Sequence, residues 1–246
     1  MKGSRDWSGE VRDRLPFSDL SFAITAAHEL KSPLALVRQL SLALESDELT
    51  SGERERIVHQ ILLTSERGLR LTTDLSRASR LEESMFTLEP VNPQQLCEEV
   101  AHELTPLYVA RGKEIRVSSR YRPVLAVANR DLLRRIMLNF GDNALHYASS
   151  DAPVELRANT RNRGDKIRIG VRDYGPAVPI DIWKRLRGAL GTDVQPLHDR
   201  PQSSGLGLYV AGQFANAMHG CIGATRHRDG ATFYVDIDAS TQMSLL

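Results

Sequence analysis

The segment His28-Glu-Leu-Lys-Ser-Pro-Leu34 places a histidine, a carboxylate and a proline close together in a stretch of helical apolar periodicity. Glu29 can accept the Nδ1 proton of His28, which leaves Nε2 as a nucleophile with a free lone pair. Pro33 costs a helix about 3 kcal/mol unless its bend is useful. Lys31 adds positive charge where phosphate oxygens would gather. A lone helical histidine is more often structural, so the hypothesis that His28 accepts a phosphoryl group depends on these neighbours.

A second segment, Asn139-Phe-Gly-Asp-Asn143, continues to His146 and Tyr147. Asn139 and Asn143 are four residues apart and share a helix face, and His146 lies on the same side. Amide oxygens can ligate a hard cation such as Mg²⁺, whose other ligands would be phosphates and waters. Taken alone, the segment is equally typical of a polar helix face.

Two further segments contain glycines next to polar groups. Asp173 follows a predicted strand, where its carboxylate can accept a hydrogen bond from the amino group of adenine, and Gly175 lets the backbone pass close to a flat ring. Gly205 and Gly207 precede a predicted helix, where exposed N–H groups and the helix dipole favour an anion. Neither a Walker loop nor a dinucleotide fingerprint fits this pattern. An ordinary turn and a loop end are the alternatives for the two segments.

The elements that must position these residues divide into two groups. Apolar residues at helical spacing predict one helix from about residue 19 to 44 and a second that begins at Thr50 or Ser51 and ends near Ala78. Each helix presents a long apolar stripe, and two helices cannot bury both stripes fully. The pattern therefore predicts a helical hairpin that pairs with a second copy in a dimeric four-helix bundle.

From Glu82 onward, strands and helices mix. Asn92 and Asn129 are predicted to cap helices that run to about Ala110 and Tyr147, and a third helix is predicted at 204–218. Strands are predicted at 86–89, 114–118, 124–128, 154–158, 166–173, 221–226 and 231–237. This order favours an α+β sandwich with its helices on one face of the sheet. Residues 188–202 lack periodicity and are a candidate mobile loop.

Composition excludes several classes of protein. The net charge of +1 and the lack of a basic stripe argue against a nucleic-acid partner. No apolar run approaches the roughly 20 residues that span a bilayer, and the first residues lack a signal-peptide core. We expect no membrane segment here and a cytoplasmic location, as a whole protein or as the cytoplasmic part of a membrane-anchored sensor. Cys97 and Cys221 are predicted to be buried, reduced thiols.

In their order and spacing, the four segments resemble the H, N, G1 and G2 boxes of two-component sensor histidine kinases. The resemblance implies a lead-in at 1–16, a dimerisation and histidine phosphotransfer domain at 17–83, a Bergerat-type ATP-binding domain at 84–239 and a tail at 240–246. It also implies ATP and Mg²⁺ as cofactors and a separate response regulator, whose receiver-domain aspartate accepts the phosphoryl group, as partner.

Residue by residue, His28 resembles the family's phospho-acceptor and Glu29 the acidic residue that activates it. Asn143 resembles the Mg²⁺ ligand and Asn139 a residue that supports the phosphates. Asp173 resembles the carboxylate that reads adenine. The remaining matches are Gly175 beside that carboxylate, Tyr147 as an aromatic near the nucleotide, and Gly205, Leu206, Gly207 and Leu208 at the phosphate end.

The sequence departs from the family pattern at three single positions and in one motif. His146 stands where the family usually has lysine, and Ala177 replaces the second glycine of the G1 box. The aromatic F box is not recognisable, and Ile182-Trp-Lys-Arg-Leu186 is the nearest candidate for anchoring the lid. Ser32 stands where kinases that also dephosphorylate their partner carry threonine or asparagine, so it is the candidate for phosphatase activity.

The sequence thus favours ATP-dependent autophosphorylation of His28 and transfer to an aspartate of a response regulator. The departures at His146 and Ala177 and the lost F box motivate an alternative, a degenerate kinase that works as a dimeric nucleotide-sensing scaffold. A gyrase- or MutL-like ATPase switch is disfavoured by residues 28–34, because such a protein has no use for a phospho-acceptor hairpin.

Overall fold

The structure, a computed structural model, describes most of the chain. The described residues are 20–78, 86–118, 125–147, 152–161, 164–177, 179–181, 183–184, 190 and 206–241, without the side chains of 20–25, 28, 146 and 147. Within them no helix is both long and apolar enough to cross a membrane.

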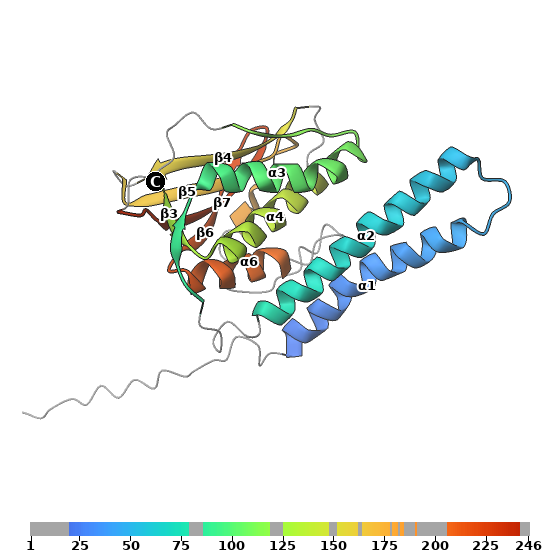
Figure 1. The fold of residues 1–246 in the computed structure, drawn as a ribbon, viewed down its shortest axis with the longest axis horizontal. Helices are drawn as coiled ribbons and strands as arrows, with labels where there is room; N and C mark the ends of the chain where they lie inside the picture. Colours follow the sequence, from blue (N-terminus) through green and yellow to red (C-terminus); the bar gives the residue numbers. More distant parts are fainter. Residues whose placement is uncertain are drawn as a thin grey trace, which may run out of the picture.

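The first two helices, α1 (Leu20–Ala43) and α2 (Ser51–Ala78), form the predicted hairpin (Figure 1). Thr50 is the N-cap of α2: its Oγ1 accepts from Glu53 N at 3.3 Å, and Glu53 Oε2 accepts from Thr50 N at 2.9 Å. This reciprocal pair is a capping box, which settles the choice between Thr50 and Ser51. Pro33, inside α1, lies against α2 at Gly68, where an added Cβ would meet the proline ring at 3.7 Å.

The rest of the chain forms an α/β sandwich. A five-stranded sheet has the order β2-β4-β5-β7-β6, in which β2 and β4 are parallel and the other neighbours antiparallel. Its strands are β2 (Ile115–Val117), β4 (Val154–Arg161), β5 (Lys166–Arg172), β6 (Cys221–His227) and β7 (Gly230–Asp238). A separate antiparallel pair joins β1 (Glu89–Val91) to β3 (Ala126–Ala128).

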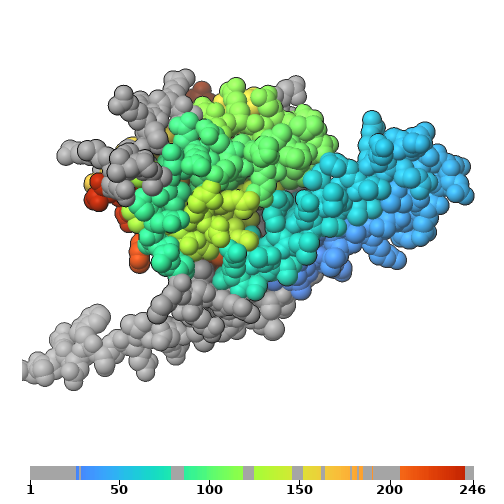
Figure 2. All heavy atoms as spheres, viewed as in Figure 1, coloured from blue at the N-terminus to red at the C-terminus, as the bar shows by residue number. Residues whose placement is uncertain are grey.

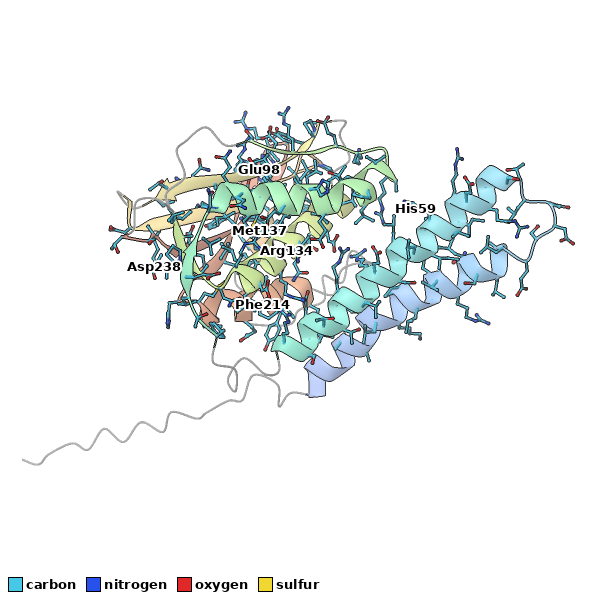
Figure 3. The ribbon with its side chains drawn as sticks, viewed as in Figure 1. His59, Glu98, Arg134, Met137, Phe214 and Asp238 are labelled. Atoms are coloured by element: carbon cyan, nitrogen blue, oxygen red, sulfur yellow. The ribbon has the colours of Figure 1, made fainter. Side chains whose placement is uncertain are left out.

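Three helices cover one face of the sheet: α3 (Pro93–Val109), α4 (Arg130–Tyr147) and α6 (Leu206–Ala217) (Figure 1). Asn92 caps α3 by accepting from Gln94 N and Gln95 N, and Asn129 caps α4 by accepting from Leu132 N at 3.1 Å. Both caps confirm the sequence prediction. Met137 of α4 and Phe214 of α6 are fully buried in the core that these helices share with the sheet (Figure 3).

The sequence predictions were wrong in three details. Residues 86–88 are not part of a strand, because β1 begins at Glu89, which is paired with Ala128 of the three-residue strand β3. Strand β4 continues to Arg161, where it is paired with Lys166 of β5, so the antiparallel partner extends it past the apolar residues. Cys221 is exposed at the start of the edge strand β6, whereas Cys97 is buried.

The hairpin lies against the sandwich along the C-terminal half of α2, while its turn projects away from the sandwich (Figure 2). Ion pairs join the two parts. Asp74 of α2 is 5% exposed and pairs with Arg135 of α4. Arg70 of α2 pairs with Glu103 of α3 at 3.3 Å, and Glu103 also binds Arg134, labelled on α4 in Figure 3. These contacts connect the hairpin to the helix layer of the sandwich.

Candidate functional site

The residues of the first segment lie on α1. The backbone of His28 belongs to this helix, and its side chain lies outside the described residues. Glu29 is half-buried, whereas Lys31 and Ser32 are exposed. Ser32 is thus open to solvent one turn after His28.

Helix α4 brings the second and fourth segments together. The Asn139 side chain donates from Nδ2 to the carbonyl of Gly207, the second residue of α6, at 3.4 Å. A Cβ on Gly207 would lie 4.0 Å from Asn139 Cγ. Asn143 is one turn further along α4 and half-buried. Two motifs 68 residues apart in sequence therefore meet where α6 begins.

The structure places the other predicted residues of these two motifs as follows. Leu206 is buried at the first position of α6, and Leu208 is half-buried. The backbones of His146 and Tyr147 form the last turn of α4, but their side chains lie outside the described residues, as does all of Gly205.

Asp173 follows the last residue of β5 and is 4% exposed. Its backbone N–H donates to the Ala231 carbonyl at 3.0 Å, and its Oδ1 accepts from Ala231 N at 3.0 Å. Burial raises the pKa of Asp173, and the Ala231 hydrogen bond and the nearby Arg172 guanidinium oppose that rise. Gly175 N donates to the Asp229 carbonyl at 3.1 Å. Ala177 is half-buried at the end of this described stretch.

Tyr108 of α3 is a supporting residue that the sequence reasoning missed. Its hydroxyl donates to the carbonyl of Gly141, between Asn139 and Asn143, at 2.8 Å. Burial raises the pKa of Tyr108, and the carboxylates of Asp142 and Asp173 raise it further. One buried phenol therefore supports the backbone of the α4 motif directly. No periodicity could have singled it out, because a tyrosine on the apolar face of α3 also matches a core residue.

Asp142, inside the same α4 segment, was also missed. Burial raises the pKa of Asp142, and the guanidinium groups of Arg67 and Arg70 from the hairpin oppose that rise. Among the described residues, no donor forms a hydrogen bond with Asp142 Oδ1. The α4 segment is thus exposed to the charges of the hairpin on one side and close to α6 on the other.

The F-box candidate, residues 182–186, is described only in part. Trp183 donates its backbone N–H to the Pro179 carbonyl at 2.8 Å and packs against the core. Ile182, Arg185 and Leu186 lie outside the described residues, as does most of the predicted loop 188–202.

The described residues contain no group of three or more histidine, cysteine, aspartate or glutamate side chains that could hold a metal ion. Mg²⁺ usually keeps several waters and binds through one or two protein oxygens plus substrate phosphates. The half-buried amide of Asn143, one turn after Asn139 on α4, can supply one such protein oxygen.

Comparison with known proteins agrees with this geometry. Residues 128–241, which include the segments around Asn143, Asp173 and Gly207, match the family described as histidine kinase-, DNA gyrase B-, and HSP90-like ATPase. The chain is 27% identical over 229 residues to the sensor protein KdpD of Mycobacterium tuberculosis, covering 89% of this chain and 26% of KdpD. It is 31% identical over 235 residues to the sensor protein SphS of Synechococcus elongatus, covering 88% and 55%.

Solved structures share the fold of this chain. Full-length ShkA in complex with AMPPNP has a TM-score of 0.59 at 25% identity, with 90% of this chain and 46% of that chain covered. The histidine kinase AdeS of Acinetobacter baumannii shares the fold, with a TM-score of 0.58 at 17% identity over 87% of this chain and 98% of that chain. The chain spans 26% of KdpD and 55% of SphS. The chain is thus similar to sensor histidine kinases over nearly its whole length, and residues 128–241 match the histidine kinase-, DNA gyrase B-, and HSP90-like ATPase family.

Proposed function

We propose that this chain transfers the γ-phosphoryl group of ATP to His28 and then to an aspartate of a separate response regulator. The observation that carries the proposal is the meeting of α4 and α6, where Asn139 contacts Gly207. Asp173 directly follows β5 in the same sandwich, and the Tyr108 hydroxyl donates to the Gly141 carbonyl between Asn139 and Asn143. Residues 17–83 would then be the phosphotransfer domain and 84–239 the ATP-binding domain.

Each residue has a defined part in the proposed reaction. Asp173 accepts a hydrogen bond from the adenine amino group, and Gly175 leaves room for the ring. Asn143 supplies an amide oxygen to Mg²⁺, which when bound offsets phosphate charge. Asn139 and the N-terminal turn of α6, with Gly205 before it, hold the phosphates. In this proposal the protein contributes mainly positioning and electrostatic stabilisation, as in other phosphoryl transfers.

On the hairpin, Nε2 of His28 attacks the γ-phosphorus while the bond to the ADP oxygen breaks. Glu29 holds the Nδ1 proton, so the tautomer with a nucleophilic Nε2 is favoured before attack and the positive charge on the ring is relieved after it. Ser32, exposed one turn further on, is the residue that would orient water if the chain also dephosphorylates its partner.

The proposal is tested by incubating the chain with γ-labelled ATP and Mg²⁺. The wild type is expected to gain an acid-labile label, because an N–P bond hydrolyses in acid, and His28→Gln is expected to gain none. His59→Gln is the matched control, since His59 is an exposed histidine of the same hairpin, on α2 (Figure 3). Labelling of His28→Gln at the wild-type level would refute the assignment. ATP binding without any labelling would favour the nucleotide-sensing scaffold.

A homodimer through the hairpin is part of the same proposal. Val58, Leu62 and Leu69 of α2 are 52%, 56% and 68% exposed and, four and seven residues apart, share one helix face. An apolar stripe of this kind on both hairpins would be buried in a four-helix bundle with a second copy.

Substitution of this stripe is expected to separate the protomers. Leu62→Glu combined with Leu69→Glu should convert a dimer to a monomer in sedimentation analysis, because charged side chains cannot be buried unpaired at the bundle interface. Val109→Glu, at a residue 67% exposed at the end of α3, is the control and should leave the dimer intact. An unchanged sedimentation coefficient for the double variant would argue against this interface.

A further inference from the structure

The last residue of β5, Arg172, is a buried cation that precedes Asp173. It is 5% exposed, and its Nη1 donates to the Asp173 carbonyl. Its Nη2 donates to Asp229 Oδ1 at 2.5 Å, and its guanidinium carbon lies 4.3 Å from the centre of the Tyr174 ring. Arg172 thus contacts both residues that follow it in the G1 segment and the turn between β6 and β7.

That turn, Arg228-Asp229, lies directly against the G1 segment. Nη1 of Arg172 also approaches the carbonyls of Asp229 and Ala231, each at 3.4 Å. The Asp229 carbonyl accepts from Gly175 N at 3.1 Å, and Ala231 exchanges hydrogen bonds with Asp173 through both its backbone groups. The path of residues 173–175 is therefore set by a turn more than fifty residues later in the chain.

Gly230 is required for this approach. Its φ is +125°, in a region that residues with a side chain rarely adopt. A Cβ at this position would lie 2.5 Å from Asp173 Oδ1 and 2.9 Å from Arg172 Nη1, too close for either atom. Glycine is the residue that lets the turn reach the carboxylate.

The buried carboxylate of Asp173 is oriented through the same contacts. Ala231 N–H binds Oδ1, so the position of β7 fixes the rotation of the carboxylate and hence the direction of its other oxygen. A shift of the turn would move Ala231 and, with it, Asp173. A hydrogen-bonding group misplaced by about 1 Å loses much of its contribution to binding.

We infer that Arg172, Asp229 and Gly230 form a clamp that positions the Asp173 carboxylate for recognition of the adenine amino group. The inference rests on the proposed function of Asp173 and extends it to three positioning residues, none of which needs to contact the nucleotide. Asp229 is the most informative of the three, because its side chain is 66% exposed and asparagine keeps an oxygen that can accept from Arg172 Nη2 while losing the charge.

The test compares binding of ATP with binding of inosine triphosphate, which has an oxygen in place of the adenine amino group. The full chain with Mg²⁺ is titrated by calorimetry as wild type, Asp229→Asn, Gly230→Ala and Arg172→Lys. Asp229→Asn is expected to lower ATP affinity about 3- to 10-fold and to change inosine triphosphate affinity by less than about twofold. Arg228→Met, an exposed residue of the same turn, is the matched control and should bind both nucleotides as the wild type does.

A double-mutant cycle that combines Asp229→Asn with Asp173→Asn separates positioning of the Asp173 carboxylate from general structural support. If the clamp acts through Asp173, adding Asp229→Asn to Asp173→Asn should cause no further loss of ATP affinity. Equal losses for ATP and inosine triphosphate, or unchanged ATP affinity in a folded Asp229→Asn variant, would overturn the clamp. If Asp173→Asn itself leaves ATP affinity unchanged, the proposed role of Asp173 fails and the clamp fails with it. Should Arg172→Lys or Gly230→Ala not fold, Asp229→Asn alone still decides between these outcomes.

Discussion

Asp173→Asn is expected to weaken ATP binding about 10- to 100-fold, because a hydrogen bond to a charged group contributes about 1.5–3 kcal/mol. Asp173 is buried, and its Oδ1 already accepts from Ala231 N. An asparagine that keeps its oxygen on Ala231 must turn its NH₂ group toward the nucleotide. Two donors, this amide and the adenine amino group, would then face each other without an acceptor.

Calorimetric titration with ATP and Mg²⁺ measures this loss directly. Asp238→Asn is a suitable control: Asp238 ends β7, is about half exposed and pairs with Lys166 at 2.6 Å (Figure 3). A surface pair of this kind contributes only about 0–1 kcal/mol to stability, so the control should bind ATP normally. ATP affinity within about twofold of wild type for Asp173→Asn would contradict the assigned role.

Asp74→Ala is expected to release the hairpin from the sandwich. Asp74 and Arg135 pair across the interface of α2 and α4, where Asp74 is 5% exposed and the Arg135 side chain 17%. Burial raises the pKa of Asp74, and the Arg135 guanidinium opposes that rise. Removal of one partner from a buried ion pair costs about 3–5 kcal/mol. Because Arg135 is partly exposed, we expect the lower end of this range, which shifts the equilibrium between docked and released hairpin about 100-fold.

Small-angle scattering and hydrogen exchange should detect this release. The radius of gyration should increase and exchange at the C-terminal turns of α2 should accelerate, while the buried amides of α3 remain protected. The matched control is Asp131→Asn, whose pair with Arg77 also joins α4 to α2 but is 3.7 Å long and exposed on both sides. That pair should contribute little. If Asp74→Ala scatters and exchanges like the wild type, other contacts hold the two parts together.

The Asp74–Arg135 pair also bears on the site, because Arg135 lies one turn before Asn139 on α4. Arg67 and Arg70 of the hairpin act on Asp142 in the next turn. The helix that carries the proposed phosphate and Mg²⁺ residues is therefore contacted by the hairpin that carries His28. A change in how the hairpin docks on the sandwich would therefore alter the charges around α4 and around the hairpin.

The sequence by itself determined the elements whose signals are local. The two Asn caps and the hairpin of β6 and β7 depend on residues within a few positions of each other, and each formed where it was predicted. The cap of α2 was predicted at Thr50 or Ser51, and the structure places it at Thr50. Helical spacing likewise predicted the hairpin, because residues three and four apart necessarily share a face. The four motif segments were found because each is a short contiguous run of residues whose types and spacing suggest chemistry.

The tertiary structure alone decided what these segments contact. The limits of β1 and β4 follow from their partner strands, which no local pattern contains. Asn139 meets Gly207, Asp74 meets Arg135, and Arg172 meets Asp229, across separations of 68, 61 and 57 residues. Arginine and aspartate are ordinary surface residues in sequence, and only the packing of distant elements removes them from water and makes their pairing matter. The residues proposed to do the chemistry were thus readable from the sequence, whereas the residues that hold them in place were not.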